Sequence, residues 1–161
     1  MSHPPKPIDG HLFGADQPCF GCGPSHPSGF HLTFEHEGDE IVTRFTPTDR
    51  YQGPPGIMHG GLVSTLADEV AAWAVIAKLG KFGFTASFEA RFRQPVRIGV
   101  TTEARARIAN ETSRLVEVDV RIMQNAHDAF TGKFKFVLVD QTAAERVLQG
   151  PLPEAWKQFC K

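Results

Sequence analysis

Four residues that could carry out chemistry are set at fixed spacing in the apolar segment GPPGIMHGGLVSTLADEVAAWAV: His59, Gly60, Gly61 and Asp68. A helical pattern begins at Gly60, so the N–H groups of the two glycines would lack an intrahelical acceptor at the positive end of a helix. Such an end can bind a carbonyl oxygen that becomes negative during nucleophilic attack. A tight loop-to-helix turn that needs glycine only for close packing is the alternative interpretation.

Asp68 lies inside the same helical pattern, among apolar residues. An unpaired buried carboxylate is costly, and aspartate is a poor helix former, so a partner or a function must account for it. The alternative is an exposed aspartate on the polar edge of the helix, beside Glu69. In that interpretation Glu69 is an ordinary solvated residue.

The rest of the chain supplies the elements that position these residues. A long, largely buried helix is predicted over 60–79 and ends at Gly80. Alternation of apolar and polar residues predicts strands, each with one apolar face, at 30–34, 41–45, 87–93, 100–108, 116–122 and 130–138. Turns are expected at Gly38-Asp39 and Asn110-Glu111.

Two strands, one helix and four strands indicate an α+β domain in which a curved antiparallel sheet of about five to six strands wraps a long central helix. We divide the chain into a proline-rich lead-in (1–29), this domain (30–140) and a tail (141–161) that is compatible with one or two short helices.

Composition limits the classes of function. The 161 residues have a net charge of −1 and no cluster of Lys and Arg, which argues against a nucleic-acid partner. No apolar run approaches the roughly 20 residues of a membrane span. The polar start, MSHPPKPIDGH, is unlike a secretory signal, so we expect a cytoplasmic protein without a membrane partner.

Three cysteines, Cys19, Cys22 and Cys160, cannot form a disulfide framework. Cys19 and Cys22 have the spacing of a zinc ligand pair, and His26 and His31 follow them. The strong form of such a zinc motif has four ligands in two paired sets, and the sequence offers only a loose group. We therefore expect no metal.

Three segments carry a resemblance to a known family. QGPPGIMHGGLVSTLADEV resembles the active-site segment of hotdog-fold acyl-CoA thioesterases of the phenylacetic-acid-degradation type. CFGCGPSHPSGFHL resembles the Cys-Phe-x-Cys-Gly-x-x-Asn-Pro-x-Gly-Leu segment of many relatives, with His26 in place of Asn and Phe30 in place of Leu. TASFEARFRQPVRIG is similar to the strand after the helix. The resemblance spans most of Cys19–Val139 and implies the hotdog fold.

The resemblance implies hydrolysis of an acyl-CoA to a free acid and CoA. Asp68 would be the general base or the nucleophile, and the Gly60 N–H would bind the oxyanion. His59 would support the loop. Thr85 would position the water or the carboxylate, or is simply a strand residue. No metal or redox cofactor is required.

Further residues are expected to contact the substrate. Gln52 is the counterpart of an Asn or Gln that relatives carry before the glycines, and Gly61 lies beside the oxyanion donor. Apolar surface around Trp73 favours a medium-chain or aromatic acyl group over acetyl. The remaining candidates are basic residues that could hold the CoA phosphates: Arg91, Arg93 and Arg97.

The spacing of Gly60 and Asp68 predicts an oligomer. Eight residues on one helix span about 12 Å, too far for both groups to reach one thioester. Two antiparallel helices related by a two-fold axis would bring Gly60 of one chain to Asp68 of the other. We expect a homodimer, and a dimer-of-dimers tetramer is compatible with the same site.

Two other functions remain open. One is a non-catalytic hotdog protein that binds acyl-CoA. The other is an enoyl-CoA hydratase, which would normally show an Asp-x-x-x-x-His arrangement. Here Asp68 follows His59, so the order is reversed.

Overall fold

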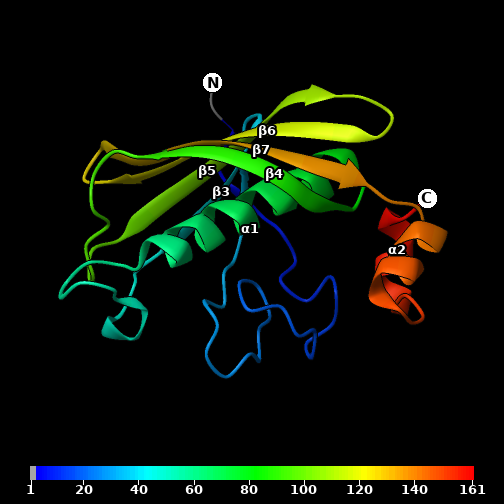
Figure 1. Cartoon of the computed structure of the whole chain (residues 1–161), viewed down its shortest axis with the longest axis horizontal. Helices are drawn as coiled ribbons and strands as arrows, with labels where there is room; N and C mark the ends of the chain where they lie inside the picture. The colour runs from blue at the N-terminus through cyan, green and yellow to red at the C-terminus, as the bar shows by residue number, and fades with distance from the viewer. Residues whose placement is uncertain (1–2) are drawn as a thin grey trace.

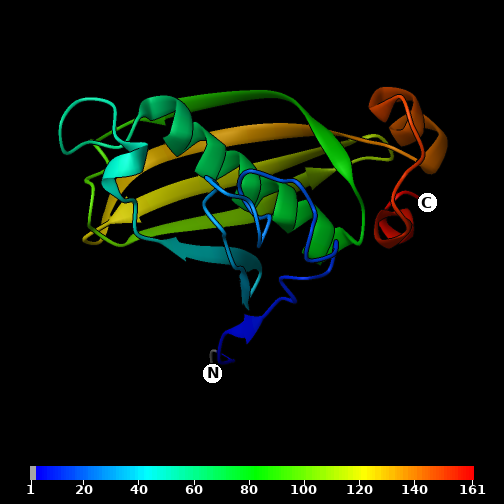
Figure 2. The same cartoon turned by 90° about the horizontal axis from the view of Figure 1, so that it is seen from below.

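One long helix, α1 (Gly60–Leu79), lies across the concave face of a curved antiparallel sheet in the computed structural model, which describes residues 3–161 (Figures 1 and 2). The strands follow one another in the order β1-β2-β3-β5-β6-β7-β4, so β4 is an edge strand. Their bounds are β1 (Lys6–Pro7), β2 (Glu35–Glu37), β3 (Glu40–Phe45), β4 (Gly83–Phe92), β5 (Thr102–Glu111), β6 (Leu115–Gln124) and β7 (His127–Leu138). The predicted architecture is confirmed. The sheet exceeds the expected five to six strands, and it includes a two-residue strand, β1, in the lead-in that pairs with β2.

Helix α1 forms the centre of the core. Its buried side chains include Val63, Leu66 and Val70, and they pack against buried aromatic residues of β7 such as Phe130 and Phe134. Burial of each such side chain contributes about 1.5–3 kcal/mol, so this contact fixes both the position and the rotation of the helix. The helix ends where the sequence predicts, because Gly80 adopts φ 63°, a left-handed conformation that glycine accepts without strain.

The strand predicted over 30–34 is wrong. Phe30, Leu32 and Phe34 are buried in alternation, as expected, but β2 begins only at Glu35. His31 has φ 54°, which breaks the extended conformation. The backbone N–H groups of Phe30 and Leu32 donate to carbonyl oxygens of the lead-in, those of Phe20 and Gly21, and not to a neighbouring strand.

The lead-in crosses the side of α1 that faces away from the sheet (Figure 2). Phe13 of the lead-in is buried and contacts the rings of Trp73, Trp156 and Phe159. The last two belong to the tail, which contains α2 (Gln141–Leu148) and the short 3-10 helix η2 (Glu154–Phe159). Short helices in the tail were expected, and the structure has them. Another short 3-10 helix, η1 (Asp49–Tyr51), precedes α1. Within residues 3–161, no helix is long and apolar enough to cross a membrane.

A buried glutamine fastens the loop after β4 to the sheet. Gln124, at the end of β6, accepts a hydrogen bond from the Arg97 N–H (2.8 Å). Its amide donates to the carbonyls of Arg97 and Val100 (3.0 Å each) and to the Thr102 hydroxyl (2.9 Å). Since the loop carries residues of the cavity described below, Gln124 also holds one wall of that cavity in place.

Replacing Gln124 with alanine should therefore destabilise the protein by about 3 kcal/mol, because buried loop groups lose their partners. Urea unfolding would measure the change. Gln158→Ala is the matched control, since that amide is exposed and makes one hydrogen bond, to the Ala155 carbonyl. The control should change the free energy of unfolding by less than about 0.5 kcal/mol. Equal effects of the two variants would contradict this role of Gln124.

Candidate active site

The first turn of α1 leaves one backbone donor free. His59 caps the helix: its Nδ1 accepts from the Gly61 N–H (3.0 Å), and its carbonyl accepts from Leu62 and Val63 (2.9 and 3.0 Å). The Gly60 N–H has no acceptor among residues 3–161. The structure therefore distinguishes the two glycines that the sequence presents together. Gly61 is used by the cap, and Gly60 offers an N–H at the positive end of the helix.

A cavity of about 330 Å³ opens beside Gly60. A Cβ built on Gly60 would lie 3.6 Å from the ring of Phe92, the last residue of β4. The other residues that line the cavity come from the loop before α1, its first turn and the loop after β4: Pro54, Ile57, Met58, Val63, Arg93, Gln94, Pro95 and Val96. Most of these side chains are apolar, so Gly60, whose N–H is free, lines a site suited to an apolar ligand with a carbonyl group.

Asp68 lies on the flank of α1 that faces β4. The Thr85 hydroxyl donates to its Oδ1 at 2.6 Å. Partial burial raises the pKa of the Asp68 carboxyl above its ordinary value, the Thr85 hydrogen bond opposes this rise, and the nearby Cys19 adds to it. Asp68 is thus a carboxylate with a raised pKa and a defined orientation, as a general base requires.

The interpretation of Glu69 as a solvated residue is wrong. The lead-in folds over this side of α1, and the thiol of Cys19 donates to Glu69 Oε1 at 3.2 Å. Burial raises the pKa of the Glu69 carboxyl to about 8. The burial of Glu69 cannot be predicted from the helix sequence, because the segment that covers it lies fifty residues earlier.

Within one chain, the predicted oxyanion donor, Gly60, and the Asp68 carboxylate lie apart. Gly60 lies beside Phe92 at one end of β4, whereas Asp68 contacts Thr85 near the other end. Gly60 and Asp68 are eight residues apart on α1, about 12 Å along the helix axis. The chain therefore does not bring the two predicted reactive groups to one point.

Two predicted binding residues have structural contacts. The Gln52 side chain accepts from the Gly56 N–H (3.1 Å) and so braces the loop before α1. Trp73 is buried and stacks on Phe34, with ring centroids 4.8 Å apart. It is not among the residues that line the cavity at Gly60. Phe92 does line this cavity, although the sequence predicts it only as a strand residue.

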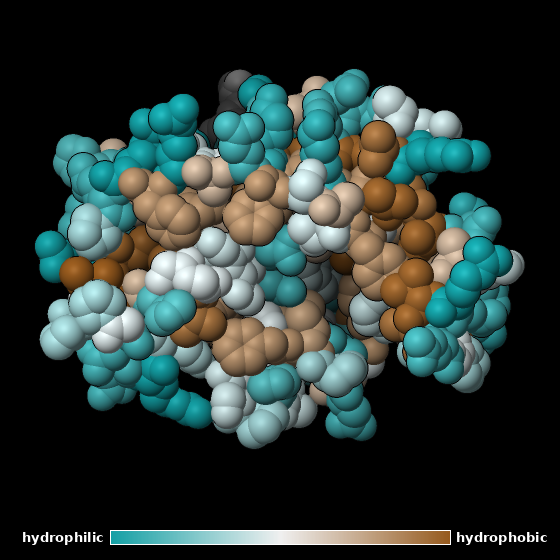
Figure 3. Space-filling model, in the orientation of Figure 1, coloured by the Kyte–Doolittle hydropathy of each residue, from teal (hydrophilic) through white to brown (hydrophobic). Residues whose placement is uncertain are grey.

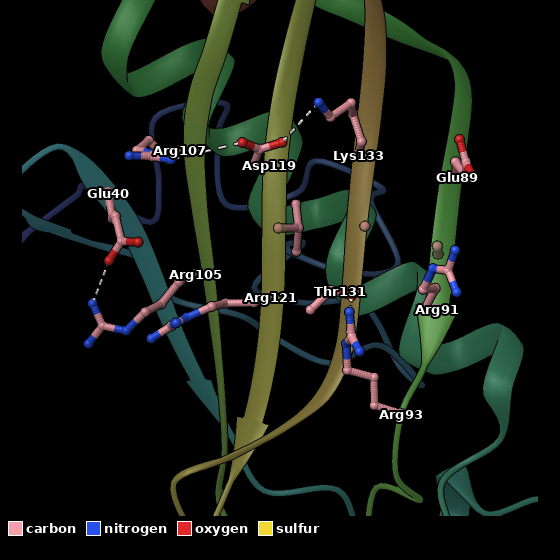
Figure 4. A pocket seen from close by; sticks show the side chains of 13 residues that line it. Glu40, Glu89, Arg91, Arg93, Arg105, Arg107, Asp119, Arg121, Thr131 and Lys133 are labelled. Carbon is pink, nitrogen blue, oxygen red and sulfur yellow. Dashed lines mark hydrogen bonds and ion pairs between the residues drawn. The ribbon is translucent and has the colours of Figure 1, made fainter.

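The three arginines predicted to bind the CoA phosphates lie in different surroundings. Arg91 projects from the face of the sheet opposite α1, into a hollow of about 780 Å³ that also contains Arg121 (Figure 4). Neither has a carboxylate partner among residues 3–161, whereas Arg105 in the same hollow pairs with Glu40. Arg93 lines both this hollow and the cavity at Gly60. It therefore links a basic surface to the apolar cavity.

Arg97 lies in the loop after β4, where its backbone N–H and carbonyl form hydrogen bonds with the Gln124 side chain.

Among the described residues, the group that could hold a metal ion consists of Cys19, Cys22 and Glu69. His26 and His31 are not part of it.

Residues 55–128 match the model of the Thioesterase superfamily. No curated protein has a sequence that matches this chain. A solved structure described as a thioesterase superfamily protein is 25% identical with a TM-score of 0.70; the similarity covers 82% of this chain and 66% of that protein, so this chain spans just under two thirds of its length.

Two further structures are similar. A hypothetical thioesterase from Streptococcus pneumoniae TIGR4, solved with coenzyme A, is 18% identical over 62% of this chain and 81% of that one, with a TM-score of 0.60. A putative thioesterase from Ralstonia eutropha JMP134, described as phenylacetic acid degradation-related, is 20% identical over 67% of this chain and 85% of that one, with a TM-score of 0.62. Together with α1 and its sheet, these similarities establish the hotdog fold expected from the sequence.

The Thr85 hydroxyl stabilises the charged form of Asp68, so removing this hydroxyl should raise the pKa of the Asp68 carboxyl. In Thr85→Val, which keeps the shape of the side chain, the pKa of Asp68 should rise further above its ordinary value. Thr85→Ser retains the hydroxyl and should stay close to the parent protein. An NMR titration of the Asp68 carboxyl carbon in the three proteins would measure the pKa. A pKa that falls or stays unchanged in Thr85→Val would contradict the hydrogen bond.

Proposed function

We propose that this chain is a member of the thioesterase superfamily and hydrolyses an acyl-CoA thioester to a free acid and CoA. The observation that carries the proposal is the free N–H of Gly60, a residue that lines an apolar cavity and lies on the same helix as the hydrogen-bonded Asp68. The family match over 55–128 and the fold shared with a hypothetical thioesterase solved with coenzyme A support it.

In this mechanism the thioester carbonyl oxygen accepts a hydrogen bond from the Gly60 N–H. Charge that develops on this oxygen is stabilised by the N–H and by the positive end of α1; a donor of this kind contributes roughly 3 kcal/mol to catalysis. As the base, Asp68 takes a proton from water, the water oxygen bonds to the carbonyl carbon, and the C–S bond breaks. The departing thiolate then takes up the proton.

Asp68 could instead attack directly. Its carboxylate oxygen would bond to the carbonyl carbon as the CoA thiolate leaves, and water would hydrolyse the resulting anhydride. Both routes need Asp68 ionised and close to the carbonyl held by Gly60. Its hydrogen bond from Thr85 leaves Oδ2 available for either role.

The edge strand β4 supports a site made by two chains. One edge of β4 is unpaired in the sheet, and its large side chains Phe88 and Phe92 are 48% and 57% exposed. Apolar surface is visible on this face of the molecule (Figure 3). Antiparallel pairing of β4 with its copy would cover these rings and bring Thr85 and Asp68 of one chain towards Phe92 and Gly60 of the other. We therefore propose a homodimer with two equivalent sites; a tetramer would be built from such dimers.

Arg93 connects the cavity to the basic hollow on the far face of the sheet. We propose that the acyl group and the pantetheine chain occupy the cavity and that Arg93, with Arg91, binds the CoA phosphates. Arg97 stays a candidate for the same role. Since Met58, Val63 and Phe92 line the cavity, a medium-chain or aromatic acyl group fits it better than acetyl.

A panel of acyl-CoAs with a thiol-reactive dye tests the proposal against the alternatives. Release of free CoA supports hydrolysis. Binding without turnover would indicate a non-catalytic acyl-CoA-binding protein, and loss of the enoyl absorbance without thiol release would indicate a hydratase. A higher kcat/KM for acetyl-CoA than for longer or aromatic substrates would contradict the proposed acyl preference.

Replacing Asp68 with asparagine keeps the volume of the side chain but removes the base and the nucleophile. We expect kcat to fall about 100-fold or more, with the fold intact by circular dichroism. Asp49→Asn, an exposed carboxylate in η1, is the control and should keep full activity. Unchanged turnover in a folded Asp68→Asn protein would assign Asp68 a structural role.

The shared site is tested by mixing two inactive variants. Asp68→Ala lacks the carboxylate, and Gly60→Pro lacks the oxyanion N–H. Proline is tolerated at the first helical position, and His59, with φ −58° and ψ 131°, already has the conformation that a residue before proline prefers. Gly60→Ala retains the N–H and serves as the control.

Unfolding the two variants together and refolding them should restore about a quarter of the parent activity, because half of the dimers are mixed and each has one intact site of two. If both variants fold and exchange subunits yet the mixture stays inactive, each site lies within a single chain.

A further inference from the structure

Two thiols and a carboxylate that the proposed hydrolysis does not use meet beneath the lead-in. Cys19 and Cys22 belong to the segment CFGC, and Glu69 comes from α1, fifty residues later. One ligand atom from each, two sulfurs and one oxygen, lie within 4.8 Å of one another. The spacing of the two cysteines is evident in the sequence, but the proximity of Glu69 to them is evident only in the fold.

The spacing of these atoms fits a zinc ion. With Zn–S bonds of about 2.3 Å and a Zn–O bond of about 2.1 Å, sulfur and oxygen ligands of a tetrahedral site lie about 3.6 Å apart. Cys19 Sγ and Glu69 Oε1 are 3.2 Å apart. Small shifts of the side chains would bring the atoms to the distances of zinc ligands.

The loop that carries the cysteines is shaped to approach Glu69. The Gly23 N–H donates to the Cys19 carbonyl (2.9 Å), and the Cys22 N–H points at Cys19 Sγ (3.5 Å), so one tight turn holds both sulfurs. A backbone N–H directed at a sulfur favours the thiolate, the form that binds metals. A Cβ at Gly21 would overlap the side chain of Glu69, so glycine is required for this approach.

The cluster is acidic and has no cation of its own. No ion pair among residues 3–161 includes Glu69 or the neighbouring Asp68. Partly buried thiolates and carboxylates are normally paired or bound to a metal. Thiolate ligands favour zinc over magnesium or calcium, which prefer oxygen.

We propose that Cys19, Cys22 and Glu69 bind a zinc ion, with a water molecule as the fourth ligand, and that this ion fastens the lead-in to α1. The sequence alone predicts no metal, because His26 and His31, the histidines that follow the two cysteines, make only a loose group of ligands. In the fold, the third ligand is Glu69. The site does not depend on the proposed hydrolysis, since its ligands lie on the side of α1 that the lead-in covers.

The test measures zinc directly. The chain is stripped with a chelator, dialysed against zinc chloride and then against buffer, and its zinc content is determined by mass spectrometry of the metal. We expect one zinc ion per chain in the parent protein and in Cys160→Ser, the control for a cysteine outside the cluster. Cys19→Ser and Cys22→Ser should lose it. Glu69→Gln should weaken zinc affinity by more than the roughly 10–100-fold that loss of an outer-shell partner costs.

Two further measurements keep the test informative if a cysteine variant does not fold. Zinc should protect Cys19 and Cys22 of the parent protein from a thiol reagent, and it should raise the melting temperature in a concentration-dependent way. Failure of the parent protein to retain zinc would overturn the proposal. So would zinc that persists in folded Cys19→Ser and Glu69→Gln, or a disulfide between Cys19 and Cys22 in the protein purified without reductant.

Discussion

The packing of α1 against the concave face of the sheet is the contact on which the rest of the structure depends. Buried residues such as Leu66 and Val70 fix the rotation of the helix. Consecutive helical residues project about 100° apart, so Asp68 and Glu69 then face different neighbours. Asp68 meets Thr85 on β4, and Glu69 meets the cysteines of the lead-in. One hydrophobic contact thereby places two carboxylates in two separate chemical environments.

Much of this arrangement follows from local sequence. The apolar surface of 60–79 and the glycine at its end predict α1 within a residue, because helix periodicity and a left-handed cap are local properties. The alternation in 116–122 and 130–138 predicts β6 and β7 for the same reason. The glycine pair at the helix start also indicates free backbone donors, and the family resemblance points to Gly60; the hydrogen bond from the Gly61 N–H to His59 leaves the Gly60 N–H as the free one.

What the sequence missed depends on contacts between distant segments. The apolar alternation at 30–34 is typical of a strand, but the backbone partners of this segment are Ile8, Phe20 and Gly21 of the lead-in, and the segment forms no strand. Glu69 looks solvated until the lead-in covers it. Phe88 and Phe92 follow the apolar pattern of a buried face yet stay exposed, because β4 is the edge of the sheet. In each case the local pattern is present as predicted, but its structural outcome depends on segments that are distant in the sequence.

In the proposed dimer, a thioester carbonyl lies between Gly60 of one chain and Asp68 of the other. A crystal structure with a ketone analogue of acyl-CoA, in which a methylene group separates sulfur from carbonyl, tests it most directly. We expect the ketone oxygen to lie within hydrogen-bond distance of the Gly60 N–H, and the carboxylate of Asp68 from the other chain to lie beside the carbonyl carbon. An analogue whose carbonyl lies away from Gly60, or whose nearest Asp68 belongs to the same chain, would contradict it.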